Sequence, residues 1–223
     1  MFTEHDYVIW GDYCSCGSEC YILQNKFHPW DEVDFSIKIQ CKNCGKTIEV
    51  DKNKAEKFYN KKIFSYFEDV KGTVIDLGCG GGLLSKLLLN NEKVTKIYAI
   101  DNDMGCKKYI DELNGGDKIT FLHMDISGLG EYFKEGQVDY IVSRDVFMFI
   151  RDTEKYFNDI NKIVSKGIKQ MGWYISDNKR MKNKLFPEQI VKELTAKNWQ
   201  VDLECLEWYK SGYFIRGFKC LTL

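Results

Sequence analysis

The sequence predicts an α/β fold in which seven mostly parallel strands form a sheet with helices on both faces, preceded by a small β unit. Three observations predict this arrangement. A short apolar run at 73–77 leads through a glycine turn into a helical segment at 83–90. Three later apolar runs are closely followed by acidic residues, and two close cysteine pairs fall within the first fifty residues. The first two patterns are typical of a sheet that binds a ligand at its carboxyl edge.

The glycine turn at 78–82 follows an apolar, β-branched run, as a central parallel strand requires when both of its faces are buried. Gly78 and Gly80 permit positive φ and carry no Cβ, so a ligand can lie against the backbone. The first N–H groups of the following helix have no partner within that helix and point towards the turn. The segment therefore predicts a cofactor site.

Two residues indicate which cofactor this turn holds. A dinucleotide-binding turn has Gly or Ala three residues after its second glycine, and here that position is Leu83. Asp76 precedes the first glycine by two residues, where it offers a pyrophosphate no favourable contact. S-adenosylmethionine (SAM) carries a sulfonium and an ammonium group, and a carboxylate attracts both. The turn favours SAM over a nicotinamide dinucleotide.

The next three predicted strands also end close to carboxylates. They are 96–100 with Asp101, 119–123 with Asp125, and 137–143 with Asp145. Ligands in open α/β sheets bind outside the carboxyl ends of the strands, so these acids are expected at one site. An acid that closes the second strand can accept hydrogen bonds from both ribose hydroxyls.

Together, the D-x-G-x-G turn at 76–80 and the strand-end acids resemble the class I SAM-dependent methyltransferases over residues 71–223. The resemblance implies a Rossmann-like sheet, SAM as methyl donor, and contacts from the turn to the methionine part. It also implies that Asp101 binds ribose and that Asp125 contacts adenine. The residues that we expect to bind SAM are Asp76, Gly78, Cys79, Gly80, Asp101, Asn102, Asp125, Ile126 and Ser143.

The loop after the fourth strand, at 143–149, is expected to face the transferred methyl group. It lacks the Asn/Asp-Pro-Pro-Tyr/Phe motif of amino-methylating adenine and glutamine enzymes, and it has no cysteine. Asp145 could act as a general base or orient a substrate hydroxyl or amine, and Arg144 could hold a substrate anion. For both residues a structural ion pair is the alternative. Phe147 and its neighbours are expected to pack rather than to recognise substrate.

The cysteine pairs define the N-terminal unit. Cys14-x-Cys16 and Cys41-x-x-Cys44 are each followed by glycine, which tolerates the positive φ of a metal-binding knuckle. Two knuckles joined by hairpins resemble a zinc ribbon with four thiolate ligands. A unit of about fifty residues has a small hydrophobic core, so a bound metal would add stability that it needs. Cys16-x3-Cys20 could supply the first pair instead. His5 and His28 are outside candidates, and thiols without metal remain the alternative.

The expected segments are therefore a zinc-ribbon-like unit at 1–50, a linking helix at 51–70 and the SAM-binding domain at 71–223. Its last third is expected to add the remaining elements. These are a helix at 152–164, a strand at 170–176, a helix at 187–197, and a final antiparallel pair of strands at 199–209 and 213–222.

Composition bounds the remaining choices. The chain has 32 basic and 33 acidic residues, so its overall charge indicates neither a nucleic acid nor a membrane partner. No apolar stretch has the length of a membrane span, and the N-terminus does not resemble a signal peptide. Nine cysteines then indicate reduced thiols or metal ligation. We expect a cytoplasmic protein.

The methyl acceptor is harder to read from the sequence. A small molecule is the leading expectation. Residues 160–185 hold seven Lys or Arg residues beside Trp173 and Tyr174, which leaves an RNA methyltransferase as an alternative. The first fifty residues contain eight acids and four bases, so this unit is unsuited to binding the phosphate backbone of a nucleic acid. A non-catalytic SAM-binding adaptor, with the ribbon binding a protein partner, is the alternative from another functional class.

Overall fold

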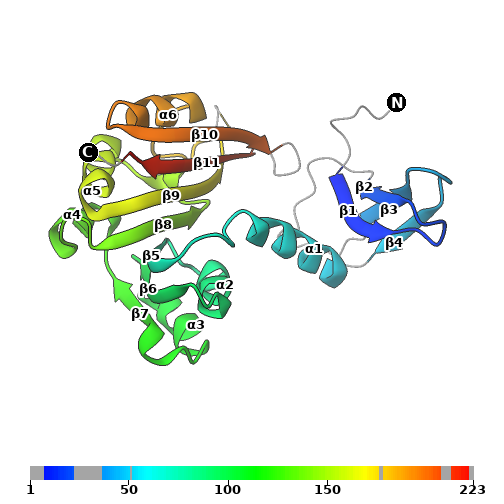
Figure 1. Ribbon diagram of the computed structural model, residues 1–223, viewed down its shortest axis with the longest axis horizontal. Coiled ribbons are helices and arrows are strands. Elements are labelled where there is room, and N and C mark those ends of the chain that lie inside the picture. The colour runs from blue at the N-terminus through cyan, green and yellow to red at the C-terminus, as the bar shows by residue number, and fades with distance from the viewer. Residues whose placement is uncertain (1–7, 23–36, 51, 176–177, 207–211, 221–223) are drawn as a thin grey trace. The chain divides into compact units, whose positions relative to one another are not determined.

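The computed structural model describes residues 8–22, 37–50, 52–175, 178–206 and 212–220 (Figure 1). The chain divides into two compact units. The first comprises Met1–Ser65 with Cys205–Gly212, and the second comprises Tyr66–Glu204 with Tyr213–Leu223. In the part of the chain that is described, no helix combines the length and the apolar character that crossing a membrane requires.

The first unit contains a four-stranded sheet in the order β1-β2-β3-β4, and each neighbouring pair is antiparallel. Its elements are β1 (Val8–Tyr13), β2 (Glu19–Ile22), β3 (Ile37–Cys41), β4 (Thr47–Val50) and the helix α1 (Lys52–Ser65). The helix predicted over 51–70 ends at Ser65 because the residues beyond it have other partners. Phe67 and Val70 are buried, and Asp69 pairs with Lys169.

The second unit is a seven-stranded sheet in the order β10-β11-β9-β8-β5-β6-β7. Its strands are β5 (Gly72–Leu77), β6 (Val94–Asp101), β7 (Ile119–His123), β8 (Val138–Arg144), β9 (Val164–Trp173), β10 (Trp199–Leu206) and β11 (Gly212–Lys219). The pairs β5–β6, β5–β8, β6–β7 and β8–β9 are parallel. The arrows of β10 and β11 point in opposite directions (Figure 1). This is the predicted seven-stranded, mostly parallel Rossmann-like sheet.

Helices pack on both faces of this sheet. They are α2 (Leu83–Asn90), α3 (Lys107–Asp111), α4 (Leu129–Tyr132), α5 (Thr153–Ile163) and α6 (Pro187–Thr195). Ala99 and Ile100 are neighbours in β6, so their side chains point to opposite faces. Ala99 belongs to a cluster with Ile110 of α3, whereas Ile100 belongs to a larger cluster with residues of α4, α5 and α6. The two clusters hold the strand ends of the second unit in place.

Most strands lie within about three residues of their predicted bounds, and one begins well before its predicted start. The fifth strand, predicted over 170–176, begins at Val164 directly after α5 and pairs with β8 from Val138 to Arg144. The first half of this strand was not predicted, because Lys166 and Lys169 interrupt its apolar run. Lys169 is 1% exposed because its ammonium group binds Asp69 and the carbonyl of Tyr66, and Lys166 forms an ion pair with Asp139.

Candidate functional site

The glycine turn after β5 has the backbone that only glycine adopts easily. Gly78, Gly80 and Gly82 all have positive φ. A Cβ at Gly78 would lie 2.4 Å from Cγ2 of Val146, so this position also lacks room for a side chain. A Cβ at Gly80 would meet nothing within 4 Å, which leaves open space beside the turn. The turn is therefore closed on the side of Val146 and open where a ligand can approach.

Asp101 ties the end of β6 to this turn. Its Oδ2 accepts the N–H of Gly80 at 2.9 Å, and its Oδ1 accepts the N–H of Asp103 at 2.9 Å. The N–H of Cys79 in turn donates to the carbonyl of Ile100 at 2.9 Å. The carboxylate predicted to bind ribose thus also fixes the backbone of the glycine turn.

Asp76 lies within β5 and is 1% exposed. Oγ of Ser85 donates to its Oδ2 at 2.6 Å. Burial removes the carboxylate from water and raises the pKa of Asp76 to about 6, although the bonds from Ser85 oppose the shift. Ser143 is also buried, and within the described ranges its hydroxyl has no hydrogen-bond partner. Both residues lie behind the surface that a ligand would touch.

Asp125 begins the 3-10 helix η4 (Ile126–Gly128). Its Oδ1 accepts the hydroxyl of Ser127 at 2.7 Å and the N–H of Ser127 at 2.9 Å. These two bonds lower the pKa of Asp125, and the positive charge of Arg151 lowers it further. Asp125 is therefore ionised and held in one orientation at the end of β7.

Arg144 and Asp145 lie at the end of β8. Nε of Arg144 is 3.9 Å from Oδ2 of Asp145, and the N–H of Asp145 donates to the carbonyl of Met171 at 2.9 Å. Asp145 has φ of 59°, an uncommon backbone conformation for a residue with a side chain. Such strain persists only where the surrounding structure enforces it, and it is concentrated at functional sites.

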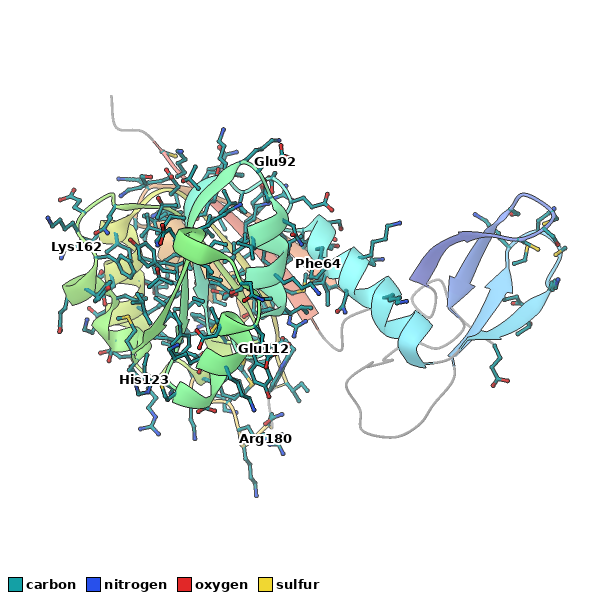
Figure 2. The ribbon with its side chains drawn as sticks, turned by 90° about the horizontal axis from the view of Figure 1, so that it is seen from below. Phe64, Glu92, Glu112, His123, Lys162 and Arg180 are labelled. Atoms are coloured by element: carbon teal, nitrogen blue, oxygen red, sulfur yellow. The ribbon has the colours of Figure 1, made fainter. Side chains whose placement is uncertain are left out.

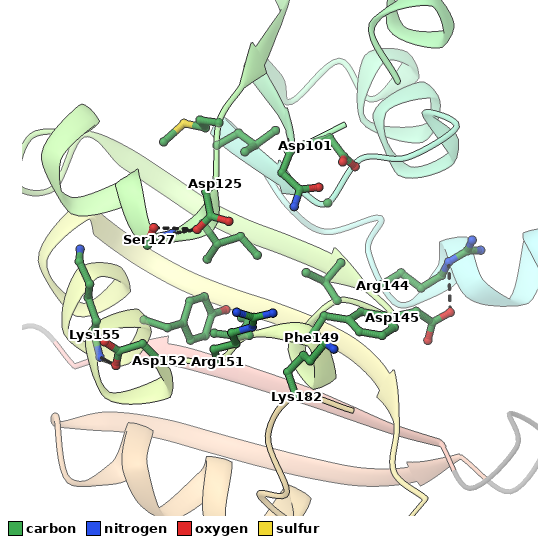
Figure 3. Close-up of a pocket in the computed structure, with 18 residues that line it drawn as sticks. Asp101, Asp125, Ser127, Arg144, Asp145, Phe149, Arg151, Asp152, Lys155 and Lys182 are labelled. Atoms are coloured by element: carbon green, nitrogen blue, oxygen red, sulfur yellow. Dashed lines mark hydrogen bonds and ion pairs between the residues drawn. The ribbon is translucent and has the colours of Figure 1, made fainter. Parts of the chain in front are cut away.

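These strand ends surround a cavity of about 840 Å³ (Figure 3). Seven of its lining residues are among those predicted from the sequence: Gly78, Asp101, Asn102, Asp125, Ile126, Arg144 and Asp145. The predicted residues Asp76, Cys79, Gly80 and Ser143 are not part of the lining. The cavity therefore joins the expected cofactor residues to the loop after β8.

The sequence reading missed other residues of the cavity wall. They include Ser127, Phe149, Arg151, Asp152, Lys155, Tyr156 and Lys182. Phe147 and Met148 are buried as expected, whereas Phe149 is 46% exposed and faces the cavity. One signal was available for Arg151 and Asp152, because they begin the helix that follows the fourth strand at the carboxyl edge. Nothing local in the sequence indicates Lys182.

The four predicted cysteines of the first unit come together. The Sγ atoms of Cys14, Cys16, Cys41 and Cys44 all lie within 4.8 Å of one another. The Sγ atoms of Cys14 and Cys44 are 3.6 Å apart, and those of Cys16 and Cys41 are 3.5 Å apart. Four thiolates at about 2.3 Å from a tetrahedral zinc ion would be separated by about 3.8 Å, so the cluster fits such an ion.

The knuckle backbones also match this role. Gly17 and Gly45 have φ of 79° and 70°, and their N–H groups donate to the carbonyls of Cys14 and Cys41. The N–H of Cys44 donates to Sγ of Cys41 at 3.4 Å and lowers the pKa of that thiol to about 6. The other candidate ligands are not decided, because His5 and His28 lie outside the described residues and only the backbone of Cys20 is described.

Comparison with known proteins identifies the second unit. Residues 75–169 match the family described as a methyltransferase domain. A malonyl-[acyl-carrier protein] O-methyltransferase of Chlorobium phaeovibrioides is 30% identical over 103 residues, which are 45% of this chain and 39% of that protein. The chain therefore spans about two fifths of the length of this relative.

Solved structures share the fold. A chain from the Haloferax volcanii complex between the Trm112 methyltransferase activator and a methyltransferase has a TM-score of 0.64 and 14% identity, covering 74% of this chain and 90% of that chain. An S-adenosylmethionine-dependent methyltransferase of Mesorhizobium loti has a TM-score of 0.62 and 11% identity, covering 71% of this chain and 96% of that chain. Residues 75–169 therefore match a methyltransferase domain, and the seven-stranded sheet around them has the fold of SAM-dependent methyltransferases.

Proposed function

We propose that the protein transfers the methyl group of SAM to a small-molecule acceptor held in the cavity at the carboxyl edge of the sheet. The size of the cavity carries this proposal. At about 840 Å³ it lies in the upper part of the ~300–1,000 Å³ range of small-ligand sites. An enclosure of this size suits a cofactor with a small acceptor beside it better than an extended polymer.

The residues present fit SAM. The space beside Gly80 lets the methionine part approach the backbone of the turn, and the strand-end carboxylate of Asp101 can accept the ribose hydroxyls. Asp125 and Ile126 line the cavity where we propose that adenine binds. SAM supplies a methyl group on a sulfonium, which is already activated for displacement. Titration with S-adenosylhomocysteine should show one site per chain, and the proposal fails if there is none.

The chain's own residues have three tasks in this reaction. They align the acceptor with the methyl group, exclude water and receive a proton where the acceptor is a hydroxyl or an amine. Asp145 is the proposed proton acceptor, because it lines the cavity in an enforced backbone conformation. Arg144 beside it is proposed to orient this carboxylate. Asp145→Asn should reduce kcat by about 10²–10⁴-fold for such an acceptor while leaving S-adenosylhomocysteine affinity unchanged.

The main alternative is RNA as acceptor, and the placement of the basic run at 160–185 weakens it. Lys169 is buried, Lys166 pairs with Asp139, and Lys162 donates to the carbonyl of Gly130 at 2.7 Å. Lys184 also donates to the carbonyl of Asn178 at 2.9 Å, so at least four of the seven cations have partners within the fold. We expect no RNA binding in gel-shift experiments at about 50 mM salt, where phosphate contacts are strongest. Salt-dependent binding there would favour the RNA alternative.

The other alternative is a SAM-binding adaptor without turnover. An assay with radiolabelled SAM and a small-molecule cell extract separates it from the enzyme, because only the enzyme labels an acceptor. Binding of S-adenosylhomocysteine without labelled product would favour the adaptor. If the chain neither binds S-adenosylhomocysteine nor labels a product, the enzyme and the adaptor hypotheses are both rejected.

We propose that Cys14, Cys16, Cys41 and Cys44 bind one structural Zn²⁺. The support is the clustering of their Sγ atoms within 4.8 Å. Elemental analysis of the purified chain should find about one zinc per chain. Its absence under reducing conditions would remove the proposal.

We also propose that the N-terminal unit binds a protein partner. The support is the Haloferax volcanii structure, which is a complex with a methyltransferase activator. A partner that co-purifies with the wild-type chain and is lost from the Cys41→Ser variant would support this role. A partner that stays bound to that variant would place the interaction elsewhere.

A further inference from the structure

The cavity contains charges of both signs, and its acids accept hydrogen bonds from residues close to them in the fold. Asp101 accepts two backbone N–H groups, Asp125 accepts two groups of Ser127, and Asp152 accepts the N–H of Lys155 at 2.9 Å at the start of α5. These carboxylates order the loops that carry them. None of the three forms an ion pair with Arg151 or Lys182, although the charge of Arg151 lowers the pKa of Asp125.

Two of the four cations in the lining form no ion pair with an acid among the described residues. Arg144 lies beside Asp145, and Lys155 forms an ion pair with Asp159 at 2.8 Å. Arg151 and Lys182 form no side-chain hydrogen bond or ion pair with any residue in the described ranges. Figure 3 shows their side chains near Phe149, away from Asp101. This wall of the cavity thus carries positive charge that no ion pair within the described residues neutralises.

Hydrogen bonds join segment 182–183, which carries Lys182, to residues 147–150, which directly precede Arg151. The N–H of Lys182 donates to the carbonyl of Met148 at 2.7 Å. The side-chain amide of Asn183 donates to the carbonyls of Phe147 at 2.7 Å and of Ile150 at 2.9 Å. Three hydrogen bonds therefore join segment 182–183 to the 3-10 helix η5 (Phe147–Phe149) and the residue that follows it. Fixing the backbone on both sides reduces the ordering that ligand binding would otherwise require.

The same wall offers an apolar surface and a buried hydroxyl. The ring of Phe149 packs edge-on against Trp173 and remains 46% exposed. Tyr156 lines the cavity and is 2% exposed, and its hydroxyl has no hydrogen-bond partner within the described part of the chain. Burial raises the pKa of Tyr156, so the hydroxyl stays protonated and can donate. A buried hydroxyl without a partner is unfavourable, and a ligand oxygen would satisfy it.

We propose that Arg151 and Lys182 bind an anionic group of the methyl acceptor, a carboxylate or a phosphate, while the organic part of the acceptor packs on Phe149. Guanidinium and ammonium groups are the side chains that bind such oxyanions through charge-assisted hydrogen bonds. This inference rests on the proposed function and adds the substrate class to it. The acceptor is a small acid rather than a neutral metabolite.

Calorimetry on the full chain saturated with S-adenosylhomocysteine tests this site. Inorganic phosphate and succinate are titrated separately at low ionic strength, so the two sources of negative charge are distinguished. We expect the wild-type chain to bind at least one of them, and the Arg151→Ala/Lys182→Ala variant to bind it at least tenfold more weakly. Arg180→Ala is the matched control, because it removes a cation from the segment of Lys182 but does not line the cavity, and Figure 2 shows Arg180 at the surface.

The outcomes separate this inference from the proposed function. If S-adenosylhomocysteine does not bind the wild-type chain, the proposed function fails. If it binds and neither anion does, or if Arg180→Ala weakens the anion as much as the double variant, only the anion site is overturned. If the double variant weakens S-adenosylhomocysteine itself at least tenfold, the two cations serve the cofactor's carboxylate and the inference is wrong.

A turnover measurement gives an independent readout. A small-molecule extract is separated on an anion exchanger at neutral pH, and each fraction is incubated with the chain and radiolabelled SAM. We expect the labelled acceptor in the retained fraction, with labelling reduced at least tenfold by the double variant and severalfold by Tyr156→Phe. Label only in the unretained fraction would overturn the inference.

Discussion

The two units of the chain are stabilised in different ways. In the second unit, buried apolar side chains form clusters on both faces of a seven-stranded sheet. In the first, the buried side chains among those described are Cys14, Cys41, Ile63 and Leu206. Small units bury little apolar surface and are only marginally stable without a metal or disulfide, whereas a sheet of seven strands buries a larger core. We therefore propose that the first unit needs a metal ion for its stability and that the second does not.

Metal removal should separate the two units with the largest effect. Structural zinc sites bind with about 10–16 kcal/mol at neutral pH, and this binding energy is folding energy. Incubation with a zinc chelator should therefore unfold the first unit and leave the second folded. Limited proteolysis should then cut within residues 8–50, while 72–173 stay protected and S-adenosylhomocysteine still binds.

Two cysteine variants control this experiment. Cys41→Ser should reproduce the effect of the chelator, whereas Cys220→Ser should not, since Cys220 is exposed and belongs to the second unit. If chelation leaves the proteolysis pattern unchanged, the four thiols are not what stabilises the first unit. Loss of the second unit as well would show that it too depends on the metal.

The second unit should show its own dependence on pH through Asp76. Its pKa is raised from 3.8 to about 6, so between these values the folded state binds a proton that the unfolded state releases. The free energy of unfolding should then fall as pH rises from about 4 to 6, and stay lower above pH 6. A shift of about two pKa units corresponds to about 3 kcal/mol. Urea denaturation of the second unit across this pH range measures it.

Asp76→Asn is the informative variant. It keeps an acceptor for the Ser85 hydroxyl but cannot ionise, so it should remove this part of the pH dependence and be more stable than the wild type at pH 7. Asp111→Asn is the control, because its carboxylate is exposed in an ion pair with Lys107. A slope that persists in Asp76→Asn would mean that Asp76 ionises normally. A buried acid that lowers the free energy of unfolding when it ionises is a candidate for a functional role rather than a stabilising one.

Asp101 tests whether the second unit holds its cofactor as proposed. Asp101→Asn replaces a carboxylate that accepts N–H groups from Gly80 and Asp103, and presents an amide to the ribose. Hydrogen bonds to a charged group contribute about 1.5–3 kcal/mol, so S-adenosylhomocysteine affinity should fall by about 10–150-fold. Calorimetry measures the loss, with Asp111→Asn as the control. Unchanged affinity would mean that Asp101 only orders the turn.

The two units also differ in how much of them the sequence predicts. The glycine turn, Asp101 and the four cysteines are defined by local spacing, which fixes what the backbone can do nearby. Lys182 reaches the cavity wall only because its N–H binds the carbonyl of Met148, a contact between segments over thirty residues apart. Such tertiary contacts leave no local pattern. The first half of β9 was missed for a similar reason, since the partner that lets Lys169 be buried lies far away in the sequence.

Lys169 gives the smallest predicted effect and the sharpest test of what stabilises the second unit. Its side chain is 1% exposed, whereas its partner Asp69 is 62% exposed. Asp69→Ala removes this carboxylate from the buried ammonium group, which keeps its bond to the carbonyl of Tyr66, and should lower the free energy of unfolding by about 1–3 kcal/mol. Lys169→Met removes the buried charge and leaves Asp69 in water, so it should change stability by less than about 1 kcal/mol. If Lys169→Met proves the more damaging of the two in urea denaturation, the ion pair contributes net stability, and apolar burial alone does not account for the stability of the second unit.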